Sequence, residues 1–250
     1  MGKVESQTDN VHAREIYRCA AELSLQSRNF EQRMPTVLNS NPNSLQAEVA
    51  SRFLVQTHFG LKAIVVLLRE ALTGPAWEHV KSLVEKRLRL RWLVEEETEK
   101  RARDFLDFRL AEEVEGHRSM AALPRYDSFE ELETLERALD TVMERRGNNE
   151  AATFYHREEW CPSTTALLKE FSEDRELCFW FSRALNHRAT GFPRDPDTDP
   201  TSSSRLLVFL AIISAFEIGA DCESLLELED DYAMCLPYLR ERLEVLVTPH

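Results

Sequence analysis

Apolar residues recur at helical spacing along almost the whole chain, and this periodicity is the feature that most constrains the fold. The longest uninterrupted stretch runs from residue 76 to about 115 and contains neither glycine nor proline. No segment shows a convincing alternation of apolar and polar residues, and the chain has only 7 glycines, whereas sheet-rich folds use glycine at their tight turns. These observations predict an all-α fold.

The predicted architecture is a single multi-helix domain of seven to nine helices. The stretch over about 76–115 predicts one very long helix, or two helices that meet at a kink. A second helix, over about 205–219, is apolar on nearly all sides, which is typical of a central buried helix. Residues 1–44 are predicted to form an N-terminal helix and linker, and residues 45–250 a single all-helical domain.

Charge and composition narrow the classes of function. The net charge of −13 disfavours a general attraction to nucleic acid, because basic side chains drive binding to a phosphate backbone. The five cysteines are scattered and the histidines show no repeated ligand spacing, so the sequence predicts no metal site and no cofactor. The N-terminus lacks the apolar core of a signal peptide, and the longest apolar run, 206–216, is too short to span a bilayer. We therefore expect a soluble, cytoplasmic protein without a membrane partner.

A charged pair, Arg91 and Glu95, falls in the apolar stripe of the long helix, one turn apart. The order with arginine first is the weaker one for a simple surface contact, so local helix stability is a poor reason for the pair. An unpaired buried charge is costly, so both groups would need partners in a core. Three interpretations stay open: a buried structural ion pair, a functional polar cluster, and a surface pair that lies outside the stripe.

A second polar pair, Arg183 and His187, lies near the end of a helix predicted over about 174–188. A cation is stabilised at a helix C-terminus by the helix dipole, which gives His187 a structural role. Alternatively the pair is catalytic and acts on RNA. An imidazole transfers protons near neutral pH, and a guanidinium binds the phosphate that is attacked.

Short motifs around both pairs resemble a bacterial family of all-helical proteins known as a domain of unknown function. The resemblance rests on "RWLVE" at 91–95, the aromatic-rich "RARDFLDF" that follows, "WCPSTTALL" at 160–168 and "SRALNH" at 182–187. It covers roughly residues 50–220, and it implies an all-helical fold with a polar cluster of Arg91, Glu95 and Ser182.

A more distant similarity is to the HEPN superfamily, whose helical ribonucleases carry an arginine and a histidine near the end of a late helix. Many of those proteins are toxins or phage-defence effectors, and they usually act as dimers. The family motif has four to six residues between the arginine and the histidine, whereas three separate Arg183 from His187 in this chain. The chain therefore departs from the catalytic spacing of that superfamily.

Two hypotheses for the function follow. The first is a binding or regulatory module, linked to phage defence or stress, that forms a homodimer and whose protein partner the sequence does not identify. The absence of familiar catalytic motifs and the acidic segment at 221–231 favour it. The second is a metal-independent endoribonuclease, in which His187 is the general acid or base and Arg183 or Arg91 steadies the phosphate. RNA is a partner only under this second hypothesis.

Overall fold

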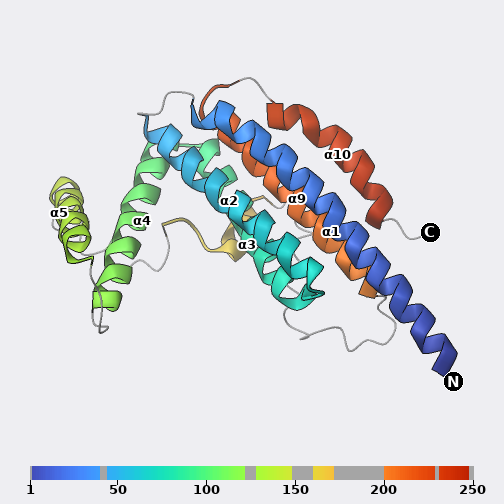
Figure 1. The fold of residues 1–250 in the computed structure, drawn as a ribbon. Helices are drawn as coiled ribbons and strands as arrows, with labels where there is room; N and C mark the ends of the chain where they lie inside the picture. The colour runs from blue at the N-terminus through green and yellow to red at the C-terminus, as the bar shows by residue number, and fades with distance from the viewer. Residues whose placement is uncertain are drawn as a thin grey trace. The chain divides into compact units, whose positions relative to one another are not determined.

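A computed structural model of the chain describes residues 2–39, 44–121, 128–147, 160–171, 200–228 and 231–247. Within these ranges it contains eight α-helices and no β-strand, so the predicted all-α class is confirmed (Figure 1). The helices belong to two compact units. The larger unit comprises Met1–Glu95 and Thr164–His250, and the smaller unit comprises Glu96–Ser163.

The larger unit is built around one central helix. Its elements are α1 (Gly2–Leu38), α2 (Leu45–Arg69), α3 (Thr73–Glu95), α7 (Thr164–Glu170), α9 (Pro200–Leu225) and α10 (Asp231–Val247). Helix α9 packs against α1, α2, α3 and α10 (Figure 1). Every residue from Leu206 to Gly219 is buried, so the predicted central helix over 205–219 is confirmed, and it continues to Leu225.

The start of α2 and its contact with α3 follow from two small residues. The hydroxyl of Ser44 accepts a hydrogen bond from the backbone N–H of Ala47 at 3.0 Å, which caps the first turn of α2. Further along α2, a Cβ added at Gly60 would lie only 3.1 Å from the side chain of Leu83 on α3. Glycine at this position therefore lets the two helices approach closely.

Helix α10 is held on α9 and α1 by the side chain of Tyr232. The phenol of Tyr232 donates a hydrogen bond to the backbone carbonyl of Phe30 on α1, at 2.9 Å. The carboxylate of Glu223, which is buried near the end of α9, accepts hydrogen bonds from the backbone N–H of Tyr232 at 2.9 Å. A carboxylate at a helix N-terminus satisfies backbone donors that lack partners within the helix. These contacts position the first turn of α10.

The stretch over 76–115 forms two helices rather than one very long helix. Helix α3 ends at Glu95, and α4 (Thr98–Ala121) begins after Glu96 and Glu97. Glu97 has φ 46°, in the left-handed region, which ends the helical path. Consecutive carboxylates are unfavourable at the C-terminus of α3 and favourable at the N-terminus of α4, because the helix dipole has opposite signs at its two ends. Charge rather than glycine or proline therefore accounts for the break.

The described part of the smaller unit is dominated by a hairpin of two helices, α4 and α5 (Phe129–Arg146). Helix α5 is strongly charged, and Gly147 follows it with φ 77°. Val114 of α4 and Leu132 and Leu139 of α5 form a small buried core between the two helices. Partly buried apolar side chains that surround this core are Leu110, Ala111, Ala121, Leu135 and Met143.

One described helix, α2, is long and apolar enough to cross a membrane by length and composition. Core helices of globular proteins pass the same test, and α2 packs against α1, α3 and α9. The length and composition of α2 are therefore only weak evidence that the chain spans a membrane.

Candidate functional site

The structure places only part of the predicted site. Ser182, Arg183 and His187 lie outside the described residues, so the catalytic pair stays a prediction. Arg91 and Glu95 lie in the last turns of α3, with the Arg91 Nε and the Glu95 Oε1 3.4 Å apart. Their side chains are 36% and 41% exposed, so the interpretation as a buried ion pair is wrong. The buried side chains in these last turns of α3 are Leu88, Leu90 and Leu93.

Arg91 nevertheless belongs to a larger group of charged residues in the larger unit. Its guanidinium carbon lies 5.1 Å from the centroid of the Phe171 ring, which follows α7, in a cation–π contact. One turn earlier on α3, Arg87 forms an ion pair with Glu217 of α9. Arg240 of α10 also binds Glu217, with its Nη2 2.7 Å from Oε1. Two guanidiniums from different helices thus compensate one buried carboxylate.

Asp221 lies one turn after Glu217 on α9, and its sequence context alone does not single it out from the acidic segment 221–231. Burial raises the pKa of its carboxyl to about 7, although Arg87 and Arg91 oppose this shift, and Glu95 adds to it. A carboxyl that titrates near neutral pH in a group of paired charges is a recognised feature of functional sites. We call Arg87, Arg91, Glu95, Glu217, Asp221 and Arg240 the arginine–carboxylate cluster.

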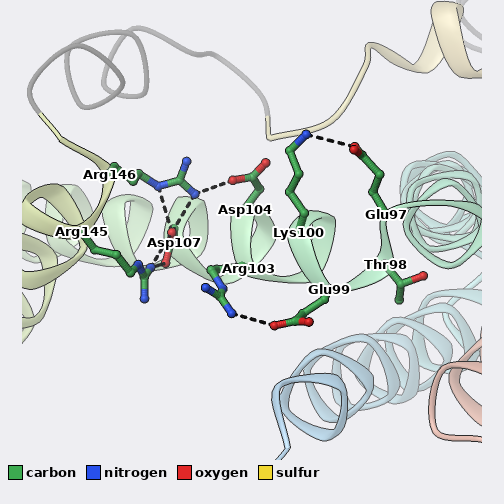
Figure 2. Close-up of a pocket in the computed structure, with 9 residues that line it drawn as sticks. All are labelled: Glu97, Thr98, Glu99, Lys100, Arg103, Asp104, Asp107, Arg145 and Arg146. Carbon is green, nitrogen blue, oxygen red and sulfur yellow. Dashed lines mark hydrogen bonds and ion pairs between the residues drawn. The ribbon is translucent and has the colours of Figure 1, made fainter.

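A second candidate site is a pocket of about 650 Å³ in the smaller unit. It lies between the start of α4 and the end of α5, and Figure 2 shows the residues that line it, with the Lys100–Glu97 and Arg103–Glu99 pairs on opposite sides of α4. Eight of the nine lining residues are charged, four with each sign, and they are Glu97, Thr98, Glu99, Lys100, Arg103, Asp104, Asp107, Arg145 and Arg146.

The floor of this pocket is a network of ion pairs centred on Asp107, which is only 5% exposed. The Nη2 of Arg145 lies 2.6 Å and 2.8 Å from the two Asp107 oxygens, and the Nε of Arg146 lies 2.9 Å from Oδ2. Arg146 also binds Asp104. Burial by itself would lower the pKa of the Arg146 guanidinium, but its hydrogen bonds to Asp104 and Asp107 raise it. The floor is therefore fixed and charged.

The rim of the pocket consists of exposed ion pairs. The Nζ of Lys100 lies 3.0 Å from Glu97 Oε2, and the Nη2 of Arg103 lies 2.9 Å from Glu99 Oε1. Exposed pairs of this kind contribute at most about 1 kcal/mol each, so they exchange partners easily. The rim can therefore bind charged groups without disturbing the floor.

Sequence reasoning missed the pocket because its key contacts join residues far apart in the chain. Asp107 and Arg145 are separated by 38 positions. The one local sign was Asp107 itself, since "FLDF" places a carboxylate between aromatic residues in a segment that faces the hairpin core.

Comparison of the chain with protein-family models, curated proteins and solved structures gives no match. Within the part of the chain that the structure describes, no group of three or more histidine, cysteine, aspartate or glutamate side chains is placed to hold a metal ion. The candidate sites therefore have to be interpreted from their own geometry.

Proposed function

We propose that this chain is a helical binding module, and that the pocket of the smaller unit binds a protein partner through charged side chains. The observation that carries the proposal is the pocket itself, with a fixed ionic floor and a rim of exchangeable ion pairs. Its volume of about 650 Å³ is within the usual range for ligand sites.

The chemistry of the lining favours a partner that carries charges of both signs. An apolar ligand would cover eight charged side chains and give them no partners in return, which is unfavourable. A polyanion such as RNA would be repelled by the four carboxylates of the pocket, and the net charge of the chain, −13, adds to this repulsion. A polypeptide segment with both acidic and basic side chains could pair with each sign in turn.

On binding, the charged residues at the rim of the pocket would exchange their present ion-pair partners for side chains of the partner protein. Arg103 and Lys100 would transfer from Glu99 and Glu97 to carboxylates of the partner. The two released glutamates would then accept its lysine or arginine side chains. Because Asp107 and its arginines keep their mutual contacts, the binding surface is largely formed before the partner arrives, which limits the entropic cost of binding.

A matched pair of charge reversals tests this proposal. A partner cross-linked to the wild-type chain would be identified, purified and titrated against Arg103→Glu and against Arg137→Glu. Arg137 is exposed on the same hairpin and makes contacts within its own turn, so it controls for the change in net charge. We expect Arg103→Glu to weaken binding by about tenfold or more, equivalent to about 1.4 kcal/mol, and Arg137→Glu to leave it unchanged. Equal affinities for both variants would exclude the pocket as the binding site.

The endoribonuclease hypothesis stays a prediction, because Arg183 and His187 lie outside the described residues. RNA cleavage and cell growth would be compared for the wild type and His187→Ala, with a melting curve for each. A wild type that cleaves RNA beside a stable but inactive His187→Ala would replace the binding-module proposal. The homodimer, the cytoplasmic location and the link to phage defence or stress also remain predictions.

A further inference from the structure

Helix α2 carries an apolar stripe on the side that faces away from its neighbours α1, α3 and α9. On this outward side Phe59 is 64% exposed and Val66 is 58% exposed, and partly buried Val55 lies one turn before Phe59. At 100° per residue, the three side chains fall within about 40° of one another. A single exposed apolar side chain is ordinary, whereas three in one row form a patch of the kind that marks an interaction surface.

The charges along this stripe sum to zero. The charged side chains on the outward side of α2 and at its C-cap are Glu48, Arg52, Lys62, Arg69 and Glu70. The sixth charge is Glu31 of α1, whose Oε1 lies 3.6 Å from the Nζ of Lys62. The chain as a whole has a net charge of −13, so two copies repel each other in general. A neutral, apolar face is a place where this repulsion is small.

We propose that α2 forms the interface of a homodimer, in which the stripes of two copies pack against each other in antiparallel directions. A two-fold axis between Lys62 and Ala63 brings Phe59 of each copy level with Val66 of the other, because both residues lie equally far from that point. Ala63 is small, so the two helices can approach closely at the axis. The inference concerns the larger unit and is independent of the charged pocket in the smaller one.

The same register matches the charges beside the stripe. In an antiparallel pair related by a two-fold axis, each side of the stripe faces the same side of the other copy. Arg52 and Glu70 are about five full turns apart, so they lie on one side, and Arg52 comes within one turn of Glu70 of the second copy. On the other side, Lys62 and Glu31 lie near the axis together with their counterparts. Opposite charges therefore meet on both sides of the apolar contact.

A lipid surface is the competing occupant of an apolar helix face. Lys62 and Glu31 lie beside the middle of the stripe, and both would lose hydration if this face entered hydrocarbon. Their side chains are 52% and 51% exposed, so at a protein interface they belong to the rim, where charged groups keep contact with water. The balance of charges favours a second copy over a strongly acidic or basic partner.

Sedimentation equilibrium of the full chain tests the interface. The wild type, Phe59→Glu and Met234→Glu would be compared at chain concentrations from about 1 to about 300 μM. Met234 is 79% exposed on α10, so it is the matched control for adding a carboxylate at an exposed apolar position. We expect the wild type and Met234→Glu to dimerise with a micromolar Kd. We expect Phe59→Glu to raise Kd by about a hundredfold or more, because each dimer carries the substitution twice.

An exchange of charges tests the antiparallel register. Arg52→Glu should weaken the dimer by about tenfold, and adding Glu70→Arg to the same chain should restore it, because the two copies then pair with reversed signs. A melting curve for each variant verifies that it is folded. A double variant that stays as weak as Arg52→Glu would overturn the register.

Three other results would overturn the dimer itself. The first is a wild type that stays monomeric at every concentration. The second is a Phe59→Glu chain that dimerises as tightly as the wild type. The third is a monomeric chain that sediments with vesicles of phosphatidylcholine and phosphatidylserine and loses this binding in Phe59→Glu, which would assign the stripe to a membrane surface.

Discussion

The ring of Tyr232 packs directly on the backbone of Gly219, so closely that a Cβ at position 219 would lie 2.5 Å from ring carbons. Both residues are buried, and Tyr232 is the side chain that joins α10 to α1. The contact therefore fixes how near α10 approaches α9.

The first prediction concerns this contact. Gly219→Ala should destabilise the fold by about 1–3 kcal/mol, because the ring of Tyr232 has to shift within a packed core. Gly116→Ala is the control, since a Cβ at Gly116 on α4 would meet nothing within 4 Å. We expect that control to be neutral or to stabilise by about 0.5–1 kcal/mol, as alanine does in a helix interior. Urea unfolding measures both, and equal effects of the two substitutions would contradict the packing argument.

A second prediction concerns the cap of α10. Glu223→Ala should lower the free energy of unfolding by about 1–3 kcal/mol, because it leaves the N–H groups of Tyr232 and Ala233 without their acceptor. Thermal unfolding followed by circular dichroism checks this. Glu227→Ala changes an exposed glutamate beyond the end of α9 and should shift the melting temperature far less. A melting temperature that is the same in both variants would argue against a capping role for Glu223.

The third prediction concerns the floor of the charged pocket. Asp107→Ala should destabilise the smaller unit by about 3–5 kcal/mol, because it leaves the guanidiniums of Arg145 and Arg146 without their main partner. Hydrogen exchange within α4 and α5 would localise the effect. The control, Glu112→Ala, removes an exposed partner of Arg109 on the same helix and should cost less than about 1 kcal/mol.

A fourth prediction is the dependence of global stability on pH. The pKa of Asp221 is raised in the folded chain from 3.8 to about 7, so the folded state binds this proton more tightly than the unfolded state. Proton binding to Asp221 therefore favours folding at low pH. This stabilisation diminishes as the pH rises from about 4 to about 7, and it is absent at higher pH. The loss is at most about 4 kcal/mol, which corresponds to a shift of about three pH units. Asp221→Asn should therefore be more stable than the wild type at pH 8, as chemical denaturation would show. Lower stability of the variant at pH 8 would mean that the attraction of Arg87 and Arg91 for the ionised Asp221 exceeds the cost of burying its charge.

Helical periodicity was sufficient to predict the fold class and the central helix. These features depend on local spacing and on the number of apolar residues, which the sequence displays directly. The break after Glu95 was left open because it depends on the sign of charge at a helix end, and neither glycine nor proline marks it.

The candidate sites were harder to predict, for a physical reason. Arg91 and Glu95 were recognised because they are four residues apart on one helix. The contacts that join Arg87 to Glu217 and Arg145 to Asp107 depend on how separate helices pack, and one sequence does not specify that register. Asp221 could not be singled out for the same reason, since the charges that act on its carboxyl, Arg87, Arg91 and Glu95, lie on α3.

The connection between the two units has a consequence for protein engineering. Helices α3 and α7 pack against each other within the larger unit, so the chain leaves that unit and returns to it at neighbouring points. The segment Glu96–Ser163 is therefore a continuous excursion between two helices that already touch. It is the part of the chain that a short linker could replace in a deletion variant that keeps α9 and the helices packed on it.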